Sequence, residues 1–200
     1  MSPRPARPRA AVLAALAALA GLLAVAALAQ PLPVAAQGAA APPHVARELA
    51  RPRLAGEGGY SWFGLRLYTA RLWVGEQGYR ADAPEAAPFV LELRYARALA
   101  GARIAEASVE QMERLGAGSA AQRAQWLQQM TAIFPDVQAG SELSGAFLPA
   151  AGTRFYLDGR ALATLADPAF AKAFYAIWLD PASSARGLRE SLLRDAAPAP

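Results

Sequence analysis

The order of strand-like and helix-like segments limits the fold of this chain more than any single motif does. Residues 65–74 and 89–96 alternate with the period of two that β-strands show. Both faces of the first segment are partly apolar, whereas the second segment is apolar on one face only. We therefore expect the second strand to be half-buried, with Glu92 and Arg94 facing water.

Two helix-like segments come next. The first, residues 103–115, has one apolar stripe and ends at Gly116, which can take the left-handed conformation of a helix C-terminus. The second opens with Ser119 and Gln122, spaced as a capping box, and stops at Pro135.

Strand-like segments then return at residues 143–148, 153–157 and 161–165, joined by turn residues 149–152 and by Asp158-Gly159. Asp167 can cap a third helix with Pro168 at its first position, and a short helix is expected from about Ser184. Antiparallel strands with helices inserted between two blocks predict an α+β fold. We expect a curved antiparallel sheet covered on one face by helices.

Residues 1–29 have the pattern of an export signal. Three arginines precede an apolar run from Ala10 to Ala29, and Ala27-Leu28-Ala29 offers a cleavage site. The run is also long enough for a membrane anchor, but its alanine content favours cleavage; residues 34–36 form an alternative site. We therefore predict a periplasmic protein, with a signal peptide at 1–29, an Ala/Pro-rich linker at 30–46, a folded domain at 47–195 and a disordered tail at 196–200.

The charge and composition of the chain exclude several classes of partner. Without the three leader arginines, 17 basic residues face 16 acidic ones, so no basic surface indicates nucleic acid binding. Membrane contact is expected only through an uncleaved leader, and protein partners are not indicated. The chain has no cysteine, and its one histidine, His44, falls in the predicted linker, where we expect a solvated side chain. We expect no metal and no cofactor.

No catalytic motif is present. The chain has no nucleophile elbow, phosphate loop or metal-spaced cluster. The glycine cluster Gly56–Gly59 lacks the setting of a dinucleotide fingerprint and is interpreted as a turn that enters a strand. Arg94 and Arg97 could hold an anion, but the simpler interpretation is that they lie on a solvent-exposed face of the sheet.

Four segments of the sequence are distinctive: residues 67–73 (LYTARLW), 154–156 (RFY), Asp167-Pro168 and 177–181 (IWLDP). Together they resemble the exported bacterial branch of the chalcone isomerase-like family, and the resemblance extends from Gly64 to Leu193. It implies an open-faced β-sandwich, in which a large antiparallel sheet packs against a helical layer with an apolar cleft between them.

The resemblance also implies where a ligand would bind. Thr69 matches the strand threonine of the plant enzymes, while Tyr60 stands in place of their arginine. The slots of their helix tyrosine and asparagine fall at Ile104 and Gln111, and that of a late threonine falls near Ala176. One of five roles is kept, and without the arginine the developing enolate charge lacks its stabilising cation.

Two functions of different classes follow from this resemblance. The first is a non-catalytic binder of an apolar molecule, such as a fatty acid or an aromatic compound, whose carboxylate Arg66 or Arg71 could hold with Tyr60. The second is an isomerase or intramolecular lyase on an unknown substrate, with Thr69, Tyr60 and Gln111 as polar contacts; it rests on family membership alone. A structural envelope protein without a ligand is the third interpretation.

Overall fold

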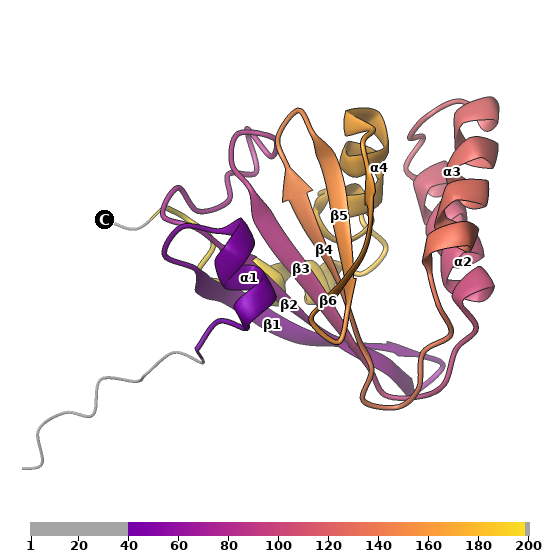
Figure 1. The fold of residues 1–200 in the computed structure, drawn as a ribbon, viewed down its shortest axis with the longest axis horizontal. Helices are drawn as coiled ribbons and strands as arrows, with labels where there is room; N and C mark the ends of the chain where they lie inside the picture. The colour runs from indigo at the N-terminus through magenta and orange to yellow at the C-terminus, as the bar shows by residue number, and fades with distance from the viewer. Residues whose placement is uncertain (1–39, 199–200) are drawn as a thin grey trace, which may run out of the picture. The chain divides into compact units, whose positions relative to one another are not determined.

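The computed structural model describes residues 40–198, so the predicted signal peptide and most of the predicted linker lie outside the described residues. Six strands in this range form one antiparallel sheet in which the order in space is the order in sequence (Figure 1). The strands are β1 (Arg53–Trp62), β2 (Leu65–Val74), β3 (Phe89–Tyr95), β4 (Glu142–Leu148), β5 (Gly152–Leu157) and β6 (Arg160–Leu165).

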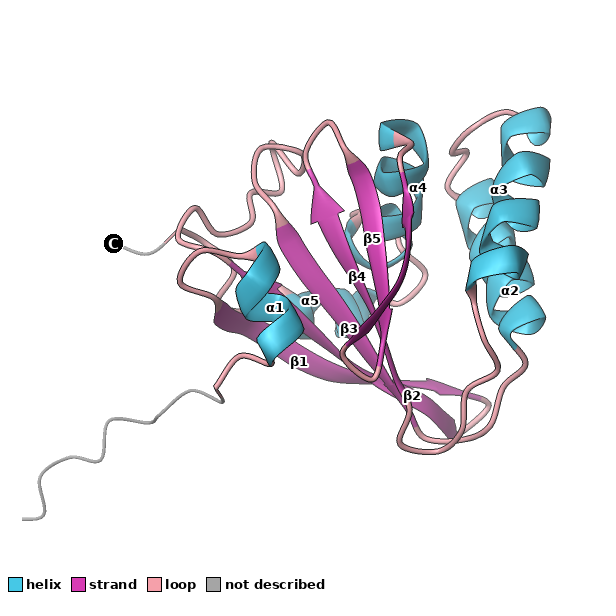
Figure 2. Ribbon diagram, viewed as in Figure 1, coloured by secondary structure: helices cyan, strands magenta, loops and turns pink. Residues whose placement is uncertain are grey.

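Four helices form a layer on one side of this sheet (Figure 2). They are α2 (Gly101–Arg114) and α3 (Ala120–Ile133), inserted between β3 and β4, and α4 (Pro168–Leu179) and α5 (Arg186–Leu192), which follow β6. The main core joins them to alternate residues of the sheet, such as Leu72, Leu91 and Phe155. The predicted α+β fold with a helix-covered antiparallel sheet is confirmed.

The helix ends form as the sequence predicts. Ser119 and Gln122 form a capping box at the start of α3. The Asp167 carboxylate accepts hydrogen bonds from the backbone of Ala169 and Phe170, which fixes the first turn of α4. Gly116 has a φ of 68°, as a left-handed helix terminus requires.

A fifth helix, α1 (Pro43–Glu48), covers part of the opposite face of the sheet. Val45 and Leu49 pack there against Trp73, Val90 and Tyr156 in a second apolar cluster. The interpretation of His44 as a solvated linker residue is therefore wrong, because its side chain is 2% exposed. The predicted linker boundary at residue 46 lies inside α1.

Strand β1 also differs from expectation. The cluster Gly56–Gly59 lies within the strand and is not a turn. A Cβ at Gly56 would come within 2.0 Å of the Ser191 carbonyl oxygen, so glycine is required where α5 crosses the strand. The residues after α5 also differ from the predicted disordered tail. Ala196 is buried, and its carbonyl accepts a hydrogen bond from the backbone of Tyr79.

No helix within residues 40–198 combines the length and apolar character needed to cross a bilayer.

Candidate functional site

An apolar pocket opens between the sheet and helix α4. Phe89 of β3 and Phe147 of β4 form its sheet wall, and their rings stack with centroids 4.9 Å apart. Tyr175 and Ala176 supply the helix wall, because α4 presents a nearly continuous apolar surface to the sheet. The pocket has a volume of about 130 Å³, close to that of an engineered apolar cavity known to hold benzene.

The rim of the pocket is polar. Lys172 of α4 pairs with Glu85 of the β2–β3 loop at 2.7 Å, and Asp180 also lines the opening. Two acidic groups therefore face one basic group around the mouth. A neutral apolar molecule suits this rim better than an anion, which would have to displace Glu85 from Lys172.

The Tyr175 ring lines the pocket, but its hydroxyl is buried in the core, close to Gly145 and to the Thr153 hydroxyl. The two hydroxyls, of Tyr175 and Thr153, are each other's polar neighbours, as buried polar groups require. Burial raises the pKa of Tyr175, and its hydroxyl is therefore protonated and able to donate.

A second cavity, of about 340 Å³, adjoins the first on the far side of Tyr79 and Pro84, which line both. Its walls come from residues 77–87, the loop between β2 and β3, and from Pro198. Tyr79 is 8% exposed and packs edge-to-face on Phe89, with ring centroids 5.5 Å apart. The Tyr79 side chain therefore stands as a partition between the two cavities.

The site residues expected from the resemblance are only partly brought together. Ala176 lines the pocket beside α4. Tyr60 and Ile104 pack against the main core between sheet and helices, and Gln111 accepts a hydrogen bond from the Ser184 hydroxyl at 2.9 Å. Thr69 lies on the opposite face, because alternation places it with Trp73 under α1 and not with Ala70 and Leu72.

Three tyrosines line up across neighbouring strands on the helix-facing side. Tyr60 stacks on Tyr68 with ring centroids 5.2 Å apart, and Tyr68 contacts Tyr95 edge-to-face at 6.0 Å. Trp178 donates a hydrogen bond to the Tyr68 hydroxyl. Burial raises the pKa of Tyr68 and of Tyr95, so both hydroxyls are protonated at neutral pH and neither can act as a general base there.

The two arginines considered for a ligand carboxylate lie elsewhere. Arg71 shares the face of Trp73 and contacts the carboxylates of Glu142 at 2.9 Å, Glu92 at 3.7 Å and Glu57 at 3.8 Å. Arg66 is exposed and lies over β1, where a Cβ at Gly59 would come within 2.6 Å of its Nη1 atom. Arg71 is thus already engaged by acidic partners on the sheet face away from the pocket.

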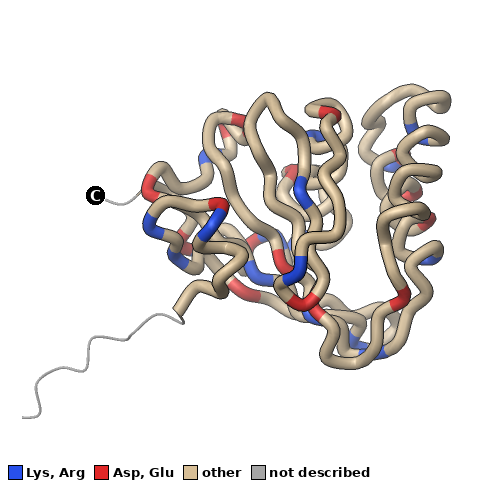
Figure 3. Tube along the Cα trace, viewed as in Figure 1, with Lys and Arg blue, Asp and Glu red and all other residues tan. Residues whose placement is uncertain are grey.

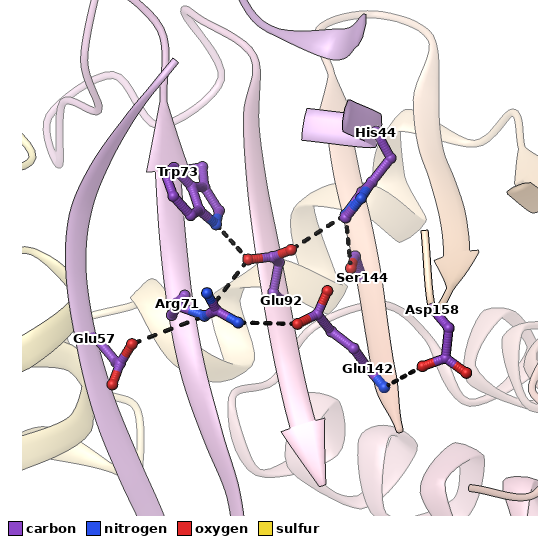
Figure 4. A network of polar contacts seen from close by, with 8 residues as sticks. All are labelled: His44, Glu57, Arg71, Trp73, Glu92, Glu142, Ser144 and Asp158. Atoms are coloured by element: carbon purple, nitrogen blue, oxygen red, sulfur yellow. Dashed lines mark hydrogen bonds and ion pairs between the residues drawn. The ribbon is translucent and has the colours of Figure 1, made fainter. Parts of the chain in front are cut away.

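Figure 4 shows the polar network to which Arg71 belongs. His44 Nε2 of α1 lies 3.2 Å from Glu92 Oε1 and 3.1 Å from the Ser144 hydroxyl, and Trp73 donates its indole hydrogen to Glu92. The expectation that Glu92 faces water is wrong: its side chain is 1% exposed because α1 covers this part of β3. Arg94, two residues on, is exposed as expected.

Within this network the pKa values of Glu92 and Glu142 are shifted in opposite directions. Burial alone would raise the pKa of Glu92, but hydrogen bonding to His44 and Trp73 and the charge of Arg71 outweigh it and lower the pKa. Burial and the neighbouring charge of Glu92 raise the pKa of Glu142. Glu92 is therefore the carboxylate that stays ionised, and Glu142 is the one that takes up a proton first.

His44, Glu92 and Glu142 could in principle hold a metal ion, since their ligand atoms lie within 4.8 Å of one another. One imidazole and two carboxylates form a donor set that divalent cations accept. The guanidinium of Arg71, however, already contacts both carboxylates and supplies the positive charge that a cation would bring. We interpret the group as an ion-pair network that attaches α1 to the sheet.

The sequence contained little signal for this network. Glu92 sits at a strand position where a wet face is the ordinary expectation, and His44 lies in a segment too short and proline-rich to show helical periodicity. The signal for the pocket was stronger, because the apolar surface of α4 and the aromatic positions of β3 are visible in the sequence. The loop wall formed by Tyr79 had no such pattern.

Comparisons with known proteins agree with this architecture. A family model described as chalcone isomerase-like matches residues 34–194. An uncharacterized protein of Haemophilus influenzae is 29% identical over 138 residues, which cover 69% of this chain and 66% of that protein. The crystal structure of a fatty-acid binding protein of Arabidopsis thaliana superposes with a TM-score of 0.60 at 16% identity, covering 73% of this chain and 88% of that one.

Proposed function

Because this chain belongs to the chalcone isomerase-like family, we propose that it binds a small apolar molecule without transforming it. The observation that carries the proposal is the pocket between the sheet and α4, walled by Phe89, Phe147 and Tyr175. A fatty-acid binding protein of the same fold supports a binding role for this architecture. Pockets that bind small ligands are typically apolar and concave, with a few polar groups that fix orientation.

The volume of the pocket limits the size of the ligand. About 130 Å³ accommodates a single aromatic ring and is below the range of pockets that enclose drug-sized molecules. The rim, with Glu85 and Asp180 beside Lys172, favours a neutral molecule. We therefore favour a neutral aromatic compound over a long fatty acid.

An isomerase function draws less support from the geometry. The polar contacts considered for it do not meet, because Thr69 lies on the face under α1 whereas Tyr60 packs on the helix side. The phenols nearest to Tyr60 remain protonated, as their raised pKa values require. Turnover of a chalcone or related enone that is lost in Tyr60→Phe would overturn the binding proposal.

The leader-like pattern of residues 1–29 supports export of this binder to the periplasm. Sequencing the N-terminus of protein recovered from a periplasmic fraction tests this part of the proposal. A mature chain that starts at Gln30 or close to residue 37 is the expected result, and an intact leader on membrane-bound protein contradicts it.

Native mass spectrometry of the mature protein, followed by organic extraction, tests the binding function itself. We expect a co-purifying neutral aromatic compound that leaves the protein on extraction. An extract that contains long-chain fatty acid instead would contradict the assignment to a single-ring ligand. Protein that carries nothing, and whose melting temperature does not change with a panel of neutral aromatic compounds, would contradict binding altogether.

A further inference from the structure

The tip of the β1–β2 hairpin exposes three large apolar side chains. Trp62 is 60% exposed, Phe63 86% and Leu65 51%. Trp62 and Leu65 are the last paired residues of the hairpin, and the Trp62 and Phe63 rings contact edge-to-face at 4.7 Å. Single exposed apolar residues are common on proteins, but a contiguous group at one tip needs an explanation.

This tip extends beyond the rest of the sheet. Pairing of β2 with β3 begins at Tyr68, whereas pairing with β1 continues to Leu65. Residues 61–66 therefore form a two-stranded extension with no third strand paired to it, at the lower end of the sheet in Figure 1. A hairpin end of this kind can enter a different environment while the core keeps its structure.

The turn itself is made at an energetic cost. Phe63 and Gly64 have φ values of 46° and 75°, the left-handed pair of a type I′ turn. The same chain builds its β5–β6 hairpin with Asp158 and Gly159, at 48° and 77°, where aspartate is a favoured residue. A bulky aromatic residue is unfavourable at this position, so the presence of Phe63 points to a role outside the turn.

The charge around the extension is basic. Residues 58–70 and 93–102 contain no acidic residue, and Arg66 and Arg97 are the basic residues next to the tip. Arg94 lies farther along β3, opposite Glu142 of β4. The hydrogen bond from Ala96 N to Leu67 O sets Arg97 opposite Arg66 at the base of the extension. Arg66 and Arg97 form no ion pair among the described residues 40–198. Figure 3 shows both basic and acidic positions at this end of the sheet.

We propose that this hairpin tip, Trp62 to Leu65 with its adjoining arginines, inserts into the interface of an anionic lipid bilayer. Trp and Phe partition to the boundary between headgroups and acyl chains, and the arginines then lie at the depth of the anionic headgroups. This inference does not depend on the pocket, since the tip projects from the sheet and none of its residues lines a cavity.

The fluorescence of Trp62 provides a direct test. Trp73, Trp126 and Trp178 are at most 5% exposed, so Trp62 is the tryptophan whose environment changes on insertion. Vesicles of phosphatidylcholine mixed with phosphatidylglycerol should shift the emission to the blue and sediment the protein. Vesicles of phosphatidylcholine alone should do so much less, and added salt should reverse the binding.

Variants separate insertion from a structural role of the tip. Phe63→Asn should lower the partition coefficient at least tenfold while leaving the melting temperature unchanged or raising it, because asparagine tolerates the left-handed conformation. Leu162→Asn, at an exposed apolar position on β6, is the matched control and should bind as the wild type does. Arg66→Gln or Arg97→Gln should each lower affinity for anionic vesicles roughly fivefold.

Three results would overturn the proposal. The first is no binding to anionic vesicles, and the second is equal binding by Phe63→Asn and the wild type. The third is a blue shift that depends on protein concentration in the absence of vesicles, which would assign the tip to self-association.

Discussion

At the residue scale, Glu92 and His44 show how one buried polar contact attaches helix α1 to the sheet. His44→Ala removes the partner of Glu92 and of Ser144 and leaves a buried carboxylate with Trp73 and Arg71 alone. We expect a loss of about 2 kcal/mol of unfolding free energy, measured by urea denaturation at pH 7. Glu110→Gln, on the exposed surface of α2, is the matched control and should change stability little. An equally small effect of His44→Ala would contradict a buried pair.

The same network sets the response to acid. The pKa of Glu92 is lowered in the folded protein, so its contribution is present above the unfolded glutamate pKa of about 4.3 and is lost as pH falls through the folded value. Glu142, with a raised pKa, takes up a proton at higher pH, and its protonation favours the folded state. Below about pH 4 the wild type should therefore lose stability more steeply than Glu92→Gln. If the free energy of unfolding falls equally steeply with decreasing pH in the wild type and in Glu92→Gln, this assignment is contradicted.

Gly145 and Tyr175 form a second residue-scale contact with a clear consequence. A Cβ at Gly145 would come within 2.6 Å of the Tyr175 hydroxyl oxygen, which is held in the core. Gly145→Ala should destabilise the protein by about 2 kcal/mol. Tyr175→Phe removes the hydroxyl and its contact with Thr153 and should cost at most about 1 kcal/mol. The double variant should recover most of the loss; additive effects in thermal unfolding would show that the two groups do not touch.

At the scale of elements, the start of α4 links two helices through one side chain. Asp167 Oδ1 caps the backbone of α4, and Oδ2 accepts a hydrogen bond from Trp126 Nε1 of α3 at 2.9 Å. Asp167→Ala loses both and should cost about 2 kcal/mol, the sum of a cap and a hydrogen bond. Ser119→Ala loses a cap alone and should cost about 1 kcal/mol. Equal losses in denaturant unfolding would exclude the link to Trp126.

The elements that the sequence predicts well are those with a strong local signal. Helices α2 to α4 and strands β2 to β6 follow from their periodicity, from the capping box at Ser119 and from the turn at Asp158-Gly159. Strand β1 escaped prediction because its glycines look like a turn until α5 lies against them. Helix α1 escaped because six residues cannot show helical periodicity, and tertiary packing of Val45 and Leu49 stabilises it.

At the scale of the whole molecule, the sheet carries different chemistry on its two faces. The helix side encloses the aromatic core and the pocket beside α4, whereas the α1 side carries the ion-pair network around Arg71. Residue types alone could not separate these faces, because the outcome depends on strand register. For this reason the predicted site residues lie on different sides of the sheet. Ala176 lines the pocket on the helix side, whereas Thr69 lies on the face that carries Trp73.

The partition between the two cavities sets the expected ligand size. Tyr79 separates a volume of about 130 Å³ from one of about 340 Å³. Tyr79→Ala should join them, so that the variant binds palmitate in a fluorescence displacement assay while the wild type does not. Tight palmitate binding by the wild type would show instead that the β2–β3 loop moves aside to admit a long chain.

The central claim is that the pocket beside α4 binds a neutral aromatic ring, and an NMR titration tests it most directly. Amide chemical shifts are followed as benzyl alcohol is added to the wild type, to Ala176→Phe, which fills the pocket, and to Ala169→Phe, which places the same ring on the exposed side of α4. Benzoate, a charged ring of similar size, serves as the second ligand.

The account predicts saturable shifts at Phe89, Phe147 and Tyr175 in the wild type and in Ala169→Phe, weaker binding of benzoate, and no saturable shifts in Ala176→Phe. Unchanged binding by folded Ala176→Phe, or shifts clustered around Tyr60 and Ile104 instead, would contradict it.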